Sequence, residues 1–584
     1  MLFLPFDHYY YTGVQQVNDL SLSNRHYGMT VPLSEEMDIM KYRQAGETYD
    51  DKVCRIAGAL RDSDSHFHSF LDILREMRFV PAGRVQNAMG SARETTAYNC
   101  FVSPIIQDSM DSIMSIAGKA AEVMRRGGGI GYDFSRIRPK GDLIKSLDSK
   151  ASGPVSYMGI FDAVCQTIAS SGHRRGAQMG VLRIDHPDNE IFLNAKHNND
   201  KLTGFNVSFG VTDKFFDHVD NGEPFPLIFE ERVYKEINAA NFWDAVMRST
   251  WDYAEPGVLY LDTINAMNNL HYCETIEATN PCAAQCLPPN GACLLGSFNL
   301  TKYVHNNQFD FGQFTFDIPH VVRAMDNVVD RTIYPLPEQE VEGKNKRRMG
   351  LGVMGLANAA EMIGYPYASA DFMEFTSNVL SVLRDETYSA SADLAEEKGA
   401  FPLYDKEKYL DGNYTATLPD WVRDKIGEKG IRNSHLTSIA PTGTISLISD
   451  NISSGIEPPF LHYYDRTIQT FDGPRVERVM DYAYSQGVEG RTANEISAVE
   501  HVDVLNLCSQ YIDSAVSKTC NVGDEVTYDQ FKSLYRRAWE GGSKGCTTFR
   551  ASGKRYGILN EVKEEEGGAE ACFIDLATGA KTCD

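Results

Sequence analysis

The sequence lacks any run of about 18 apolar residues, so it predicts no transmembrane helix. Its first residues, MLFLPFDHYYYTG, include neither a basic segment nor a small-residue cleavage site, which predicts no signal peptide. Basic residues are also scarce, since 56 Lys and Arg stand against 80 Asp and Glu and give a formal net charge of −24. A surface that negative argues against partners such as nucleic acid or an anionic membrane. Anionic small molecules are not excluded, because a local cavity can be positive.

Cysteine is too sparse for a disulfide scaffold, with 12 residues in 584. Without a secretion signal, these cysteines are expected to be reduced thiols, some of them chemically active. The apolar fraction of 42% and charged fraction of 23% are typical of a globular protein. The length predicts about four domains, or one large α/β domain with appendages.

Three regions differ in pattern along the chain. Residues 1–80 look helical and polar, and residues 81–550 alternate glycine-punctuated apolar runs with amphipathic helices, which favours an α/β domain. Residues 551–584 are glycine-rich and acidic, and we expect a flexible tail there. That tail carries Cys572 and Cys583, although an unstructured segment has no packing use for a thiol.

One helix is predicted from its start at Asp108 and Asp111 to its end at Arg126, where three glycines follow. Its expected apolar stripe is Met110, Ile113, Met114, Ala117, Ala120, Ala121 and Met124. The basic loop 135–140 that follows suggests an anion site, and the alternative is a solvated basic loop.

Two glycine-containing segments resemble phosphate-binding motifs. The segment 350–355 matches G-x-G-x-x-G but follows a basic run instead of an apolar strand, so we interpret it as a closely packed glycine strand. The segment Pro441–Ser446 follows an apolar stretch and would present hydroxyls and backbone N–H groups to an anion. A plain strand-to-helix turn is the alternative reading.

The most informative stretch contains Cys282, Cys286 and Cys293, whose spacing fits no zinc knot, so we predict no metal site. Residues 280–286 and 291–300 resemble the N-x-C-x-E finger loop and the following G-x-C-x-L-G-S-x-N-L strand of the ribonucleotide reductase large subunit. Further segments resemble that family in chain order: 96–101, 129–138, 171–180, 441–458 and 544–550. The likeness covers about residues 80–550.

This resemblance implies an α/β fold with a ten-stranded barrel of two five-stranded parallel halves. The finger loop of Cys282 would run through the centre of the barrel. A helical N-terminal region, residues 1–80, would precede the barrel domain, residues 81–550, and shows no match to the family's ATP-cone. The tail, residues 551–584, would follow as a redox segment.

The resemblance also implies the chemistry, which is the reduction of ribonucleotides, expected to be diphosphates, to 2′-deoxyribonucleotides for DNA precursor supply. Cys282 would carry a thiyl radical, Asn280 would hydrogen-bond the sugar hydroxyls, and Cys100 with Cys293 would supply two electrons as a dithiol. The tail cysteines would reduce the resulting disulfide by exchange with a thioredoxin-like or other dithiol reductant.

Binding residues follow from the same motifs. The substrate would contact Ala82, Asn99, Gly129, Pro441, Thr442, Gly443, Thr444 and Ile445. An allosteric deoxynucleoside triphosphate or ATP would bind at the interface of a homodimer. Its expected ligands are Asp108, Ser109, Arg138, Lys145, Arg175 and Gln178.

Two departures from the family bear on activity. The family's general base, a glutamate two residues after the radical cysteine, is replaced by Ala284. The family members that take a radical from a partner carry a tyrosine pair near the last strand, where this chain has Thr547, Thr548 and Phe549. The chain therefore resembles class II, which uses adenosylcobalamin. The alternatives are a class I large subunit with a radical-generating partner and a non-catalytic nucleotide-binding relative. We expect a cytoplasmic location, in the host cytoplasm if the sequence is viral.

Overall fold

The structure is a computed structural model that describes residues 27–144, 147–168, 177–197, 201–470 and 473–550. It also describes three short tail strands by their backbone, β22 (Leu559–Asn560), β23 (Cys572–Ile574) and β24 (Lys581–Cys583). The described chain is a mixed α/β protein. None of its described helices is both long and apolar enough to cross a lipid bilayer.

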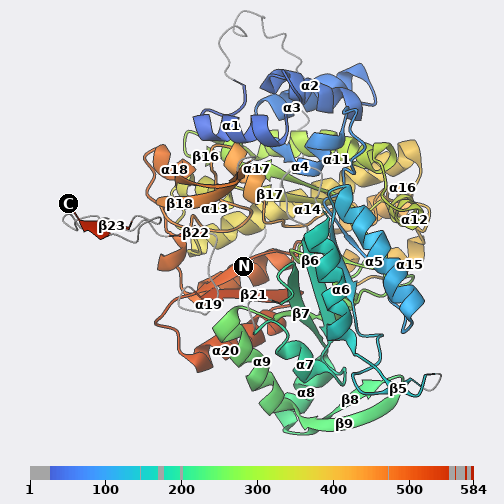
Figure 1. Cartoon of the computed structure of the whole chain (residues 1–584). Coiled ribbons are helices and arrows are strands. Elements are labelled where there is room, and N and C mark those ends of the chain that lie inside the picture. The colour runs from blue at the N-terminus through green and yellow to red at the C-terminus, as the bar shows by residue number, and fades with distance from the viewer. Residues whose placement is uncertain are drawn as a thin grey trace, which may run out of the picture.

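Three helices form the N-terminal part of the described chain and lie together at the top of Figure 1. They are α1 (Pro32–Lys41), α2 (Tyr49–Leu60) and α3 (Asp64–Arg75). Helix α2 begins at a capping box in which the Thr48 side chain accepts a hydrogen bond from the Asp51 backbone. The strand β1 (Phe79–Pro81) and the short helix α4 (Gly83–Ala88) follow. Helices α1, α2 and α3 lie within residues 1–80, where the sequence predicts a helical region.

Five parallel strands are neighbours in chain order in the larger sheet. They are β2 (Cys100–Val102), β3 (Gly129–Asp133), β6 (Gln178–Arg183), β7 (Phe205–Val211) and β10 (Gly257–Tyr260). Helices α5 (Met110–Arg125), α6 (Pro154–Thr167), α7 (Asn189–Leu193), α8 (Asp213–Asn221) and α9 (Ala239–Tyr253) lie between them in sequence. The hairpin of β8 (Pro224–Phe229) and β9 (Arg232–Asn238) lies at the end of the molecule opposite α1–α3 (Figure 1).

A second group of strands also pairs in parallel. Strand β14 (Leu295–Asn299) pairs with β17 (Gly350–Met354), and β20 (Thr519–Val522) pairs with β21 (Gly545–Arg550). Two single parallel bridges, Leu351 to Thr437 and Ile439 to Val516, lie between these pairs. Antiparallel contacts join the two groups, because β10 pairs with β21 and β13 (Ala292–Cys293) pairs with β2. The predicted glycine strand at 350–355 is confirmed as the buried strand β17.

The remaining described elements complete the chain between and after these strands. They are β4 (Leu143–Ile144), β5 (Ser149–Lys150), α10 (Leu261–Ala266), β11 (Ala278–Thr279), β12 (Cys286–Leu287), η2 (Leu300–Tyr303), β15 (Val304–His305), β16 (Gln308–Phe309), α11 (Phe311–Arg331), α12 (Pro337–Lys346), α13 (Leu356–Ile363), α14 (Ala370–Lys398), α15 (Lys406–Leu410), η3 (Thr415–Thr417), α16 (Asp420–Lys429), α17 (Gly443–Ile448), β18 (Tyr463–Thr470), β19 (Gly473–Met480), α18 (Tyr482–Ser485), η4 (Ala493–Glu495), α19 (Ala498–Ser509) and α20 (Tyr528–Glu540).

Helix α5 corrects two details of the sequence prediction. Ser109, and not Asp108, caps its N-terminus, because the Ser109 hydroxyl accepts a hydrogen bond from the Ser112 backbone. Met110 and Met114 are 54% and 50% exposed, so they do not belong to the buried stripe. The buried stripe includes Ile116 and Val123 instead, because the side of α5 that carries Met110 and Met114 faces outward.

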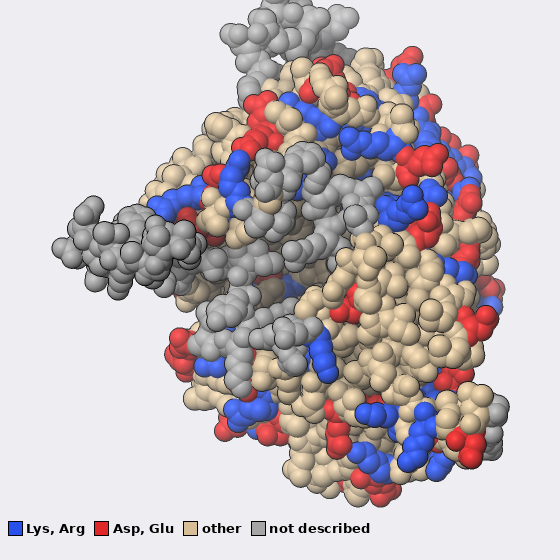
Figure 2. Space-filling view, viewed as in Figure 1, with Lys and Arg blue, Asp and Glu red and all other residues tan. Residues whose placement is uncertain are grey.

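Charged side chains of both signs are interspersed over the face drawn in Figure 2. The surface over α5 and α6 is an exception, because few charged side chains lie there (Figures 1 and 2). The sequence of α6 explains this, since its only charged residue, Asp162, is buried. The exposed methionines of α5 add apolar area to the same region.

Candidate active site

The segment that carries Cys282 is a tight antiparallel hairpin formed by β11 and β12. Asn280 closes its tip, because its side-chain oxygen accepts a hydrogen bond of 3.1 Å from the backbone of Gln285. The Thr279 hydroxyl donates to the Gln285 carbonyl at 2.8 Å. Ala283 adopts a left-handed conformation, with φ of 55°. These contacts fix the finger loop predicted from the sequence.

Residues of β3, of β7 and of the segment Thr437–Ile439 position this hairpin. The Asn206 side-chain amide donates to the Pro281 carbonyl at 3.0 Å, and the Ser438 hydroxyl donates to the Ala284 carbonyl at 2.6 Å. A Cβ atom on Gly131 of β3 would collide with the Thr279 carbonyl oxygen, so only glycine allows this approach. The backbone on both sides of Cys282 is therefore held by side chains far apart in sequence.

The thiol of Cys282 lies at the meeting point of two cavities, and this half-buried residue lines both. The Asn280 side-chain amide donates a hydrogen bond of 3.2 Å to its sulfur atom. A group in either cavity could therefore reach the same thiol. This position suits transfer of a hydrogen atom through Cys282 from one cavity to the other.

Cys100 and Cys293 lie directly opposite each other in the antiparallel β2–β13 pair, and both are buried. Burial raises the pKa of Cys293 well above its usual range, and the neighbouring Cys100 and Cys282 sulfurs would raise it further. Cys293 is therefore held as a protonated thiol, able to deliver a proton. The structure thus brings together the two residues predicted as the redox pair.

The first cavity, which we call the Thr442 cavity, has a volume of about 760 Å³. It is lined by Cys282 and Cys100 and by most of the predicted substrate residues: Ala82, Asn99, Pro441, Thr442, Gly443, Thr444 and Ile445. Gly129 lies beside it, since a Cβ there would be 3.2 Å from the Cys100 sulfur. Thr442 has φ of 51° and turns the chain into α17.

Two polar atoms in the wall of the Thr442 cavity have no hydrogen-bond partner among the described residues. They are the buried hydroxyl of Thr95 and the buried side-chain oxygen of Asn99. A buried polar group left unpaired is costly, so both atoms are suited to hydrogen-bond a bound molecule. The sequence prediction included Asn99 but missed Thr95.

The Thr442 cavity is lined by basic and not by acidic side chains, although the protein is strongly acidic. Four basic side chains line it, Lys41, Arg84, Arg93 and Arg466, and none of its described lining residues is Asp or Glu. The sequence prediction missed all four, because no local pattern distinguishes them from surface basic residues. Ala284 is fully buried and does not belong to this lining.

The second cavity, which we call the Thr547 cavity, has a volume of about 210 Å³. It lies on the other side of the hairpin and is lined by Cys282, Ala283, Cys286, Thr547 and two buried lysines, Lys518 and Lys544. Its described lining contains no tyrosine, tryptophan or phenylalanine. The thiol of Cys282 therefore meets no aromatic side chain in this cavity.

Both lysines of the Thr547 cavity are neutralised or hydrogen-bonded by the protein. The Lys518 ammonium group pairs with Glu457 at 2.6 Å and lies 3.0 Å from the His501 ring. The Lys544 ammonium group donates to the backbone carbonyls of Asp513 and Ser514. Burial lowers the pKa of Lys544. These lysines stabilise the cavity wall.

The residues predicted to bind an effector are partly brought together. The Arg138 guanidinium pairs with Asp108 at 2.5 Å, and the neighbouring Ser109 caps α5. Gln178 is elsewhere, because it accepts from the Tyr132 hydroxyl and donates to a backbone carbonyl of α6 in the core. Lys145 and Arg175 lie outside the described residues.

The tail cysteines, Cys572 and Cys583, are opposite each other in the antiparallel pair of β23 and β24. Their side chains lie outside what the structure describes.

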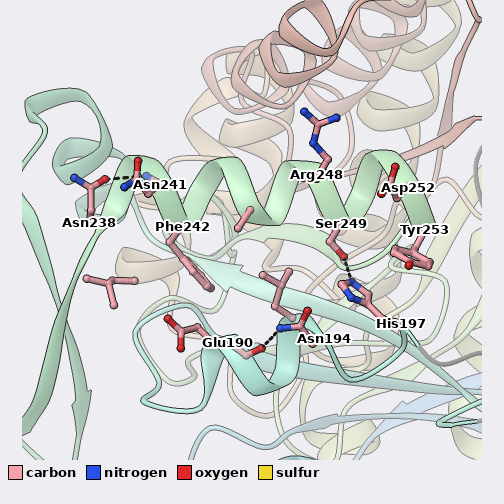
Figure 3. Close-up of a pocket in the computed structure, with 13 residues that line it drawn as sticks. Glu190, Asn194, His197, Asn238, Asn241, Phe242, Arg248, Ser249, Asp252 and Tyr253 are labelled. Atoms are coloured by element: carbon pink, nitrogen blue, oxygen red, sulfur yellow. Dashed lines mark hydrogen bonds between the residues drawn. The ribbon is translucent and has the colours of Figure 1, made fainter.

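A third cavity, of about 630 Å³, lies between α7 and α9 (Figure 3). His197 stacks on Tyr253 with ring centroids 4.4 Å apart and contacts the Ser249 hydroxyl at 2.9 Å. Glu190 and Asn194 line the opposite wall, on and just after α7. None of the predicted site residues lines this cavity.

Comparison with known proteins agrees with this geometry. Residues 98–486 and 490–549 match the family model described as ribonucleotide reductase, barrel domain. A Thermoplasma acidophilum protein named vitamin B12-dependent ribonucleoside-diphosphate reductase is 34% identical over 550 residues, covering 88% of this chain and 69% of the relative. A Mycobacterium tuberculosis protein of the same name is 34% identical over 524 residues, covering 84% and 73%.

A more distant relative carries a different name. The ribonucleoside-diphosphate reductase subunit alpha of Chlamydia pneumoniae is 26% identical over 455 residues, covering 68% of this chain and 43% of the relative. The matched barrel model extends over the hairpin of Cys282, the Cys100–Cys293 pair and the Thr442 turn. The chain therefore belongs to the ribonucleotide reductase family.

Proposed function

We propose that this chain is a class II ribonucleotide reductase that converts ribonucleoside diphosphates to 2′-deoxyribonucleoside diphosphates with adenosylcobalamin. One observation carries the proposal: Cys282 lies at the tip of a fixed hairpin between two cavities, near the facing thiols of Cys100 and Cys293. The names of the relatives that are 34% identical support the same substrate class and cofactor.

The strand pairings support a closed ten-stranded barrel around this hairpin. One half would be the five parallel strands β2, β3, β6, β7 and β10. The other half would be β14, β17, the segment at Thr437–Ile439, the segment from Val516 into β20, and β21. The antiparallel contacts of β10 with β21, and of β2 with β13 next to β14, would join the halves.

The substrate would bind in the Thr442 cavity. Its phosphates would contact the turn Pro441–Ile445, and its sugar would lie near Asn280 and Asn99. Cys282, as a thiyl radical, would take the 3′-hydrogen atom of the ribose. The 2′-hydroxyl would leave as water, and the thiols of Cys100 and Cys293 would supply two protons and two electrons and become a disulfide. Cys282 would return the hydrogen atom to C3′.

The Thr547 cavity is the place expected for the reactive end of adenosylcobalamin. When bound, this cofactor supplies the radical that abstracts the hydrogen atom of a thiol. A cavity of about 210 Å³ is smaller than those that hold drug-sized ligands, so only the adenosyl end would enter it. Ala283, Thr547 and Asn206 would surround that group. The lack of an aromatic residue in the described lining argues against a tyrosine relay from a radical-generating partner.

Other parts of the proposal concern regulation and reduction. A homodimer is supported by the charge-poor surface over α5 and α6, where Met110 and Met114 are exposed. A deoxynucleoside triphosphate or ATP would bind there near Asp108 and Arg138. The tail cysteines, opposite each other in β23 and β24, would exchange with a dithiol reductant.

A second function, nucleotide binding without turnover, is favoured by one specific observation. Ala284 occupies the position of the family's glutamate, and the described lining of the Thr442 cavity contains no carboxylate that could replace it. Such a chain would bind substrate and effector but would not complete the reduction.

One assay separates these candidates. Purified chain, adenosylcobalamin, dithiothreitol, effector and a ribonucleoside diphosphate are mixed, and deoxynucleotide is measured by chromatography, together with substrate binding by calorimetry. Class II activity predicts product without a second protein, at a rate that rises in Ala284→Glu. Product only after addition of a metal-bearing subunit would favour class I. Binding without product in both forms would favour the non-catalytic function.

A further inference from the structure

Helices α1 and α4, which precede the matched barrel residues, contribute to the lining of the Thr442 cavity. Helix α1 docks on α17, because the Ser34 hydroxyl donates to the Leu447 carbonyl at 2.6 Å. Asp450, just after α17, accepts hydrogen bonds from the backbone N–H groups of Thr30 and Val31 at 2.8 and 2.9 Å. These contacts join the N-terminal end of α1 to the C-terminal end of α17, and four residues from the other end of α1, Met37, Met40, Lys41 and Tyr42, line the cavity.

Two basic residues of this region, Lys41 and Arg84, line the cavity from elements that pack on each other. Lys41 is the last residue of α1, and Tyr42 follows it. A Cβ atom on Gly83 would lie only 2.6 Å from the Tyr42 ring, so the start of α4 packs directly on Tyr42. Arg84, the next residue of α4, is 8% exposed and lines the same cavity as Lys41.

Two further basic residues complete the group. Arg93 lines the cavity from the exposed loop before β2. Arg466 of β18 also lines it and donates to the Gly443 carbonyl at 2.6 Å, which ties β18 to the turn at Thr442. The described lining of the cavity thus includes four basic side chains and no carboxylate.

We infer that Lys41, Arg84, Arg93 and Arg466 bind the terminal phosphate of the substrate, so that the N-terminal region is part of the substrate site. This inference rests on the proposed function and deepens it, because it assigns selection of the diphosphate to named residues. A guanidinium group can donate two parallel hydrogen bonds to the oxygens of one phosphate, and an ammonium group adds a point charge. Burial lowers the pKa of Lys41, and a bound phosphate would stabilise its charged form.

The test compares binding of a ribonucleoside diphosphate, the monophosphate and the free nucleoside by isothermal titration calorimetry. The variants are Lys41→Met and Arg93→Gln, and Arg93 is exposed, so its replacement leaves the core intact. Lys41→Arg is the conservative variant. Lys408→Met is the matched control. Lys408 is exposed on α15 and does not line the cavity, and its replacement by methionine removes the same charge as Lys41→Met.

Loss of one charged hydrogen bond is expected to weaken diphosphate binding about 10- to 100-fold. Nucleoside binding should not change, so the preference for diphosphate over monophosphate should fall in both variants and return in Lys41→Arg. An unchanged preference in Lys41→Met and Arg93→Gln would overturn the inference while leaving the proposed function in place. Failure of the unaltered chain to bind any diphosphate would overturn both.

Discussion

Replacing Ala284 with glutamate is the most informative single change in the active site. Ala284 is fully buried, its carbonyl is held by Ser438, and its neighbours in the core include Ala82, Ala440 and Leu295. A longer side chain at a closed position costs about 1–3 kcal/mol of folding free energy. A general base placed beside the substrate contributes about 10²- to 10⁴-fold in rate. We therefore expect Ala284→Glu to melt at a lower temperature and to turn over 10²- to 10⁴-fold faster.

The matched control is Ala284→Gln, which adds nearly the same volume without a group that can take a proton. It should lose as much stability as Ala284→Glu, measured by thermal unfolding, and gain no activity, measured as deoxynucleotide per minute. Nucleotide affinity should stay within a few-fold in all three forms, because the Thr442 turn is unchanged. Equal turnover of the unaltered chain and Ala284→Glu would refute the assignment of position 284 as the base position. If Ala284→Gln gains as much turnover as Ala284→Glu, the side chain at position 284 does not act by proton transfer.

Three other outcomes are expected. Cys572→Ser with Cys583→Ser, in the Ala284→Glu background, should retain multiple turnovers with dithiothreitol and stop after one with a thioredoxin-like protein; sustained turnover with the protein would contradict the tail assignment. Met114→Glu should weaken the proposed homodimer, measured by sedimentation with effector present, whereas an unchanged association would exclude the α5 surface. Burial raises the pKa of Glu361 to about 8. The folded chain then keeps a proton that the unfolded chain releases near pH 4.5. The free energy of unfolding therefore falls by about 3–5 kcal/mol as the pH rises from 4.5 to 8. Glu361→Gln should reduce the fall in melting temperature between pH 4.5 and 8. If the melting temperature depends on pH equally in both forms, the role of Glu361 is refuted.

The sequence was most informative where chemistry and local pattern coincide. The motif around Cys282 predicted a finger loop, and the β11–β12 hairpin lies there. Cys100 and Cys293, 193 positions apart in the numbering, were predicted as partners and lie opposite each other in one strand pair. The segment 350–355 was interpreted as a closely packed glycine strand, and Gly350–Met354 form the buried strand β17.

The sequence did not predict the features that depend on packing between segments far apart in the chain. The periodicity of α5 placed Met110 and Met114 in the core, but apolar periodicity does not distinguish a core face from a surface that a partner would cover. Lys41 belongs to a cavity built around Thr442, four hundred positions later, and only the docking of α1 on α17 brings them together. The close approach of Gly131 to Thr279 could not be predicted from the sequence either, because no neighbouring residue requires a glycine at that position.

The most direct test of the central claim is electron paramagnetic resonance of the chain alone with adenosylcobalamin, effector and substrate diphosphate. In the proposed mechanism, formation of the radical needs Cys282 and not the family's glutamate, so the unaltered chain is suitable. The account predicts a cob(II)alamin signal coupled to a sulfur radical, lost in Cys282→Ser. It predicts that Cys286→Ser, which removes another thiol of the Thr547 cavity, keeps the signal. A coupled signal that survives Cys282→Ser, or no signal from the unaltered chain, would contradict the assignment of Cys282 as the radical residue of a class II enzyme.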